Sequence, residues 1–132
     1  PSPRSALRTQ RQRDWARKLA DKGRLVLDDV TFAGRTGNLS RDGGLADLAL
    51  VLAASPDLTV RIDGYVDATG DPAEDARVSY DMVKAAAQRL IDLGVEGSRV
   101  GTAGHGGENP LLPNFTARGR AANRRLEVAS PR

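Results

Sequence analysis

Apolar residues recur along this chain with two different periods, one typical of helices and one typical of strands. The helical period is clearest in residues 42–54, where Leu45, Leu48, Ala49 and Leu52 form one apolar stripe. Because these positions are three or four residues apart, they lie on one side of a helix. We expect this helix to pack on the core through that stripe.

A second main helix is predicted from residue 71 to about residue 93 by the signals at its two ends. Asp71 can cap the first turn, Pro72 fits the first helical position, and Glu74 follows the cap at the spacing of a capping box. Gly94 is typical of the residue that ends a helix.

Strands and shorter elements account for the rest of the pattern. Runs that alternate or are rich in β-branched residues predict strands, and glycine and proline mark the loops. Strands are predicted at residues 24–32, 58–64, 99–104 and 124–129, a short helix at residues 116–122, and an irregular loop at residues 105–114. The order β-α-β-α-β-(α)-β predicts an α/β fold (an α+β sandwich), with two main helices packed on one mixed four-stranded sheet.

Charge divides the chain into a basic start and an acidic body. Residues 1–24 carry a net charge of +6 and residues 25–132 a net charge of −3. We expect a basic helical lead-in over residues 1–23, one domain over residues 24–129 and a tail over residues 130–132. The lead-in is either an arm that binds a membrane or envelope surface or, as we favour, a solvated linker helix, because it has little apolar surface.

Composition argues against several classes of function. Basic groups gather in the lead-in and the chain has only five aromatic residues, so we expect no nucleic-acid partner. Cysteine is absent and His105 is the single histidine, so we expect no metal site and no cofactor. Residues 48–54, the longest apolar stretch, cannot span a bilayer, so any membrane anchor is expected outside this chain. No nucleophile–base pair is recognisable, and an enzyme is not expected.

Three spaced motifs carry the candidate chemistry. The first reads G-Y-V-D-A-T-G over residues 64–70 and ends a predicted strand. The second reads D-x-x-V-S over residues 75–79, early in the long helix. The third reads N-x-T-x-x-G-R-A-x-N-R-R-L-E over residues 114–127. The third motif is long, and chance agreement with a family pattern of the same length is improbable.

Together these motifs resemble the OmpA-like domain, the peptidoglycan-associated module of Gram-negative envelopes. The family pattern reads G-H-T-D-x-x-G, then N-x-x-L-S-x-x-R-A, then N-x-T-x-x-G-R-x-x-N-R-R-V-E. The resemblance covers residues 25–128, about four-fifths of the chain. The lead-in is similar to the segment that precedes this domain in envelope lipoproteins of the family.

The resemblance implies a domain that holds the diaminopimelate group of a peptidoglycan stem peptide. In the family an aspartate grips the ammonium of the ligand, and Asp67 stands at its position. Backbone groups after the first strand assist, and these fall on Phe32, Ala33 and Gly34. A fixed anion beside a guanidinium suits a zwitterionic amino acid. The implied place is the bacterial cell envelope, at the periplasmic face of the outer membrane.

Two site positions depart from the family pattern. Met82 replaces the arginine that grips the carboxylate of the ligand, and Asp75 replaces an asparagine, whereas Ser79 is retained. Losing one partner of a desolvated charge pair costs roughly 2–5 kcal/mol, or about 30-fold to several-thousand-fold in affinity. Arg124 can approach the site from another side and compensate; alternatively, it forms a structural salt bridge with Asp67.

Two functions from different classes follow. The first is a non-catalytic cell-wall-binding module that recognises the diaminopimelate stem peptide through an altered site and tethers an envelope protein. The alternative is a structural or protein-interaction domain that has lost peptidoglycan binding and has an envelope protein as its partner. An exposed apolar patch around Val66, Val78 and Met82 would favour the alternative.

Overall fold

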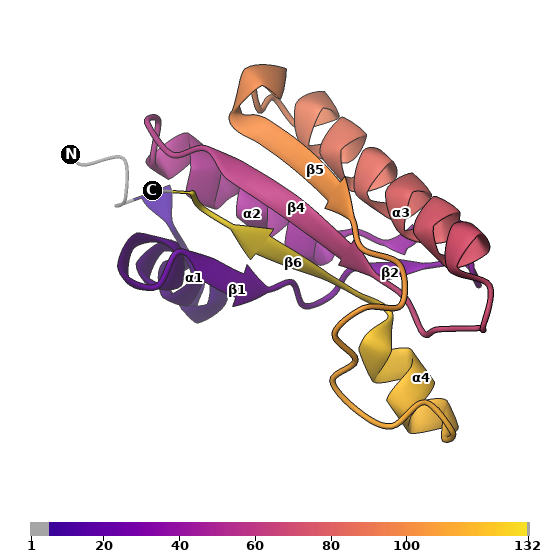
Figure 1. The fold of residues 1–132 in the computed structure, drawn as a ribbon. Coiled ribbons are helices and arrows are strands. Elements are labelled where there is room, and N and C mark those ends of the chain that lie inside the picture. Colours follow the sequence, from indigo (N-terminus) through magenta and orange to yellow (C-terminus); the bar gives the residue numbers. More distant parts are fainter. Residues whose placement is uncertain (1–5, 132) are drawn as a thin grey trace.

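The structure, a computed structural model, describes residues 6–131 (Figure 1). Residues 1–5 and residue 132, which belong to the predicted lead-in and tail, lie outside the described residues. The helices are α1 (Gln10–Asp21), α2 (Gly43–Ala54), α3 (Pro72–Asp92) and α4 (Ala117–Asn123), and the strands are β1 (Arg24–Val26), β2 (Thr31–Phe32), β3 (Leu39–Arg41), β4 (Val60–Tyr65), β5 (Val100–Gly104) and β6 (Arg125–Ala129).

Four of the strands form a mixed sheet in the order β1-β6-β4-β5. β4 and β5 are parallel, whereas β6 is antiparallel to both β4 and β1. Alternate residues of a strand share a face, and Val60, Ile62, Leu126 and Val128 belong to the core cluster. The other face of β4 and β6 carries charged side chains. The predicted fold class, with two main helices and one mixed four-stranded sheet, is confirmed.

The two main helices lie on the same side of the sheet (Figure 1). The predicted stripe of α2 is buried, with Leu45, Leu48 and Leu52 fully inaccessible to solvent. α3 runs along β4 and β5 and begins as expected, because Asp71 accepts a hydrogen bond from the backbone N–H of Glu74 at 3.2 Å. The Glu74 side chain pairs with Arg77 and does not complete a capping box.

α1 differs from the solvated linker helix that we expected. Trp15 and Leu19 are buried in the core cluster, and the helix packs on α2 and β1. Gln12 Nε2 also donates a hydrogen bond to Asp47 Oδ1 of α2 at 2.8 Å. A single tryptophan supplies a large apolar area, so a narrow stripe was enough to fix this helix. The expectation of a solvated helix is wrong for α1, whereas the domain boundary at residue 23 stays a prediction.

The single strand predicted at residues 24–32 is wrong. The chain turns after β1 at Asp29, whose φ is +57°, and β2 pairs with β3 in a separate hairpin that the sequence analysis missed. The turn fits against the start of α2, where the backbone N–H of Gly44 donates to the Asp29 carbonyl at 3.0 Å. A Cβ on Gly44 would overlap the carbonyl of Asp28, so glycine is what allows this close approach.

Replacing Leu48 by Ala should lower the free energy of unfolding by about 2–5 kcal/mol, because a fully buried side chain leaves a cavity in the core. Leu50→Ala is the matched control in the same helix, since Leu50 is 46% exposed, and it should change that free energy by less than about 0.5 kcal/mol. Urea unfolding followed by circular dichroism measures both. Equal losses would contradict the placement of α2 on the core.

Candidate functional site

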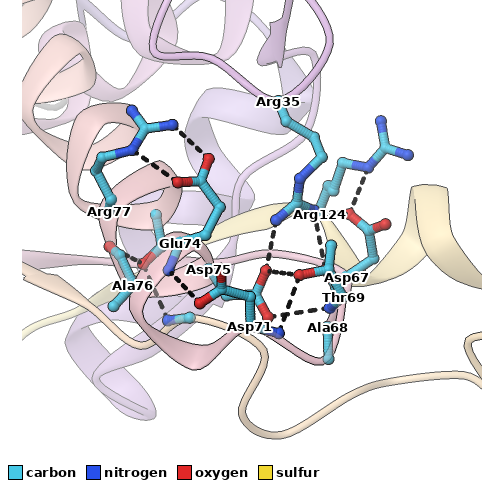
Figure 2. Close-up of polar contacts among 12 residues, drawn as sticks. Arg35, Asp67, Ala68, Thr69, Asp71, Glu74, Asp75, Ala76, Arg77 and Arg124 are labelled. Atoms are coloured by element: carbon cyan, nitrogen blue, oxygen red, sulfur yellow. Dashed lines mark hydrogen bonds and ion pairs between the residues drawn. The ribbon is translucent and has the colours of Figure 1, made fainter.

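Asp67 lies two residues beyond the end of β4, in the segment that leads to α3. The residue is only 5% exposed. Its Oδ1 accepts hydrogen bonds from Arg35 Nη1 at 2.8 Å and from Arg124 Nε at 2.7 Å (Figure 2). Arg35 belongs to the β2–β3 connection, and Arg124 is the residue between α4 and β6. The carboxylate thus joins three segments that are far apart in the sequence.

Asp75, in the first turn of α3, is the second buried carboxylate of the site and is 2% exposed. Its Oδ2 accepts the backbone N–H of Thr69 at 3.0 Å, and its Oδ1 accepts the Thr69 hydroxyl at 2.8 Å. Arg35 Nη2 also donates to Asp75 Oδ1 at 2.6 Å. Asp75 therefore fixes the turn before α3 and shares the Arg35 guanidinium with Asp67 (Figure 2).

Hydrogen bonding sets the protonation state of Asp75. Burial, the largest single influence, would raise the pKa of this carboxyl group. The hydrogen bonds from Thr69 and the positive charge of Arg35 together outweigh burial and hold the pKa below its ordinary value. Asp75 is therefore an anion at neutral pH, which the asparagine of the family pattern is not.

Ser79, which the resemblance places in the site, has a structural position. It is fully buried on α3, and its hydroxyl donates to the Ala76 carbonyl at 2.9 Å. The same oxygen accepts the backbone N–H of Gly106 at 2.9 Å, which ties α3 to the loop after β5. Within residues 6–131, Ser79 makes no hydrogen bond to Asp67 or Asp75.

Met82 is buried and forms part of the wall of a cavity of about 180 Å³. The cavity is lined by Val30, Thr31, Phe32, Gly34, Met82, Ala121, Arg124, Arg125 and Leu126. The structure thus brings together four of the predicted site residues, Phe32, Gly34, Met82 and Arg124. Ala33 is not among the lining residues; it is exposed, and its backbone N–H donates to the Asn38 carbonyl.

The contacts of Arg124 are consistent with both of the alternatives that the sequence analysis left open for it. It forms the salt bridge with Asp67, and it also lines the cavity beside Met82. Only its Nε is used in that bond, and Nη1 and Nη2 bind no group in the part of the chain that the structure describes. Two nitrogens of this guanidinium are therefore available to an anion.

Arg35, which binds both buried carboxylates, is one residue of the candidate site that the sequence analysis missed. It lies between Gly34 and Gly37 in what reads as an ordinary loop, and its two carboxylate partners are 32 and 40 residues away. One signal was available in the sequence. Arg35 is a cation that directly follows Phe32, Ala33 and Gly34, the segment whose backbone is expected from the family resemblance to assist the ligand. Thr69, which anchors Asp75, was also missed as a site residue.

A metal site, a membrane-spanning helix and an exposed apolar patch are three other features that bear on function. No group of three or more His, Cys, Asp or Glu side chains among residues 6–131 is placed to hold a metal ion. Within the same range, no helix has the length and hydropathy needed to cross a bilayer. Val66, Val78 and Met82 are each buried, so they form no exposed apolar patch.

Comparison with known proteins decides the family. The family model described as the OmpA family matches residues 31–124. The chain belongs to the OmpA family. This agrees with the resemblance carried by the three motifs, which all lie within or overlap the matched residues.

Relatives of this OmpA-family chain include the probable lipoprotein YiaD of Escherichia coli, 38% identical over 76% of the chain and 47% of YiaD. The peptidoglycan-binding protein ArfA of Mycobacterium bovis is 42% identical over 58% of the chain and 24% of ArfA. The chain thus spans less than half the length of these relatives. A putative MotB-like protein of Desulfovibrio vulgaris shares the fold, with a TM-score of 0.71, 23% identity and 98% of each chain covered.

Replacing Asp75 by Asn should lower the free energy of unfolding at pH 7 by about 1–3 kcal/mol, because a buried, charge-assisted network is lost. The pKa of Asp75 is lowered by folding, so its contribution is complete above the ordinary carboxyl pKa of about 4 and disappears as pH falls through the folded pKa. Urea titrations at pH 7, 5 and 3 should show the difference between the two proteins shrinking below about pH 4.

The control for this titration is Asp57→Asn, since Asp57 is exposed and makes no ion pair within residues 6–131. It should leave the unfolding free energy nearly unchanged at all three pH values. A difference for Asp75→Asn that stays constant with pH would contradict the charged state assigned to Asp75.

Proposed function

We propose that this domain is a non-catalytic cell-wall-binding module that recognises the diaminopimelate group of a peptidoglycan stem peptide. The observation that carries the proposal is the pair of Asp67 and Arg124 beside the cavity that Met82 lines. A zwitterionic amino acid has one ammonium and one carboxylate, and this pair presents the complementary anion and cation. The name of ArfA, a peptidoglycan-binding relative, supports the same assignment.

Each side chain of the proposed site has a distinct role. Asp67 Oδ2, which forms no hydrogen bond within residues 6–131, accepts the ammonium of the ligand. Nη1 and Nη2 of Arg124 donate to the carboxylate and so supply the cation that Met82 does not. Phe32 and Met82 contact the methylene groups of the ligand, and the site is therefore altered rather than lost.

The proposed role of the module is to tether an envelope protein to the cell wall at the periplasmic face of the outer membrane. Its partners are then peptidoglycan and an envelope protein. YiaD, a probable lipoprotein, supports an envelope setting.

A structural or protein-interaction domain that no longer binds peptidoglycan is the second candidate. The observation in its favour is that Asp67 already has two guanidinium partners, which compensate its charge without any ligand. The apolar patch expected for this function at Val66, Val78 and Met82 is buried, which weighs against it.

Cosedimentation with purified sacculi that contain diaminopimelate tests the proposal. The parent protein should pellet, and Asp67→Ala should remain in the supernatant. Arg124→Gln should bind roughly 30-fold more weakly or worse, as expected for loss of about 2 kcal/mol or more from a charge pair. Arg118→Gln is the matched control, since Arg118 is exposed, forms no ion pair in the described part of the chain, and should bind like the parent.

Met82→Arg separates the two candidate functions. If the parent pellets and Asp67→Ala does not, a working wall-binding site is supported. If the parent stays soluble while Met82→Arg pellets, the fold is a scaffold whose site has been lost, and the second candidate is favoured. Thermal unfolding of each variant establishes that a failure to pellet reflects the site rather than the fold.

A further inference from the structure

The Arg35 guanidinium occupies the space between the two buried carboxylates of the site. Its Nη1 donates to Asp67 Oδ1 at 2.8 Å and to the Asp67 carbonyl at 2.9 Å. Its Nη2 donates to Asp75 Oδ1 at 2.6 Å (Figure 2). Three charge-assisted hydrogen bonds from one side chain make this the most heavily bonded cation of the site.

A cation in this position stands beside the place proposed for the ammonium of the ligand. A carboxylate attracts an ammonium and a guanidinium by the same charge and through the same oxygen atoms. Asp67 is the anion of the proposed ligand site, and Arg35 is already bound to it. A ligand ammonium that approaches the unbonded Oδ2 therefore meets the Arg35 guanidinium on Oδ1 of the same carboxylate, and the two positive charges repel each other.

The change at Asp75 accounts for how Arg35 is retained. A buried carboxylate needs a positive partner, and Arg35 is the only cation that pairs with Asp75 among residues 6–131. If residue 75 were the neutral asparagine of the family pattern, Arg35 would lose this ionic partner and keep only Asp67. The loop arginine and the helix carboxylate thus act as one matched pair.

Arg35 can leave the site without disturbing the core. Its side chain is 26% exposed, and it extends from the connection between two short strands. That connection is held by its own bonds, from the Ala33 N–H to the Asn38 carbonyl and from the Thr36 hydroxyl to the Ala33 carbonyl. A change of rotamer in Arg35 therefore opens Asp67 while the hairpin stays in place.

We propose that Arg35 is a further residue of the ligand site, an internal cation that competes with the ligand for Asp67. This inference rests on the proposed function and deepens it. The ammonium of the ligand displaces Arg35 from Asp67, Asp75 retains the displaced guanidinium nearby, and Arg124 receives the carboxylate. The ligand can bind only the molecules in which Arg35 has left Asp67, so the apparent affinity for the stem peptide falls in proportion to that fraction. The Arg35–Asp67 ion pair therefore sets how tightly the module binds peptidoglycan.

Calorimetric titration with a soluble stem tripeptide that ends in diaminopimelate measures this competition. Arg35→Gln should lower the Kd by about tenfold, which corresponds to an open site in about one parent molecule in ten. Arg35→Gln/Asp75→Asn guards against misfolding, because it leaves no unpaired carboxylate at position 75, and it should also bind more tightly than the parent. Arg41→Gln, which removes an exposed arginine of β3 that pairs with Asp29, should leave the Kd unchanged.

The outcomes separate the inference from the proposed function. Tighter binding by both Arg35 variants supports the inference, including the case in which the parent binds too weakly to detect. If the parent binds and the variants bind equally or less tightly, Arg35 does not compete and the inference is overturned, while the proposed function stands. If the parent and both variants fail to bind, the proposed function is overturned and the inference with it.

Discussion

The need of two buried carboxylates for positive partners governs the arrangement around the end of β4. Asp67 and Asp75 are nearly inaccessible to solvent, and a buried anion without a partner would cost several kcal/mol. The chain meets this need with Arg35 from the β2–β3 connection and Arg124 from between α4 and β6. Four segments are thereby joined at one point, where these bonds set the geometry of the site.

A buried carboxylate is also paired with positive groups on the face of the sheet that carries no main helix. Asp63 is fully buried on β4, where burial would raise its pKa, but Arg61 and His105 more than offset burial and lower it. His105 Nε2 lies 3.0 Å from Asp63 Oδ1 at hydrogen-bond distance, and the imidazole stacks on the Tyr65 ring with the two ring centroids 4.8 Å apart. Arg125 lies over the Tyr65 ring, with its guanidinium carbon 4.2 Å from the ring centroid. Charged side chains and an aromatic ring thus cover the strands in place of a helix.

Local signals were enough for the helices and the central strands, and insufficient for the site. α2 and α3 follow from the spacing of Leu45, Leu48 and Leu52 and from the cap at Asp71, because these features act within one or two turns. The bend at Asp29 was missed because the strand-forming residues on its two sides, 25–27 and 30–32, read as one run, and the β2–β3 hairpin was missed with it. Arg35 extends from that hairpin, so its contacts with distant carboxylates depend on a turn that the pattern does not reveal.

The register of the sheet has a mechanical consequence. Arg24 of β1 lies opposite Ala129 of β6, which also lies opposite Arg61 of β4, whereas Tyr65 and Arg125 mark the end of the sheet near Asp67. The chain thus enters the sheet at one end, and the candidate site is at the other (Figure 1). Under the proposed tethering role, a pull that enters through β1 and is resisted by a ligand at Asp67 would run parallel to the strands. The hydrogen bonds between β1 and β6 lie across that direction, so this short ladder would be loaded in shear and would bear the tension.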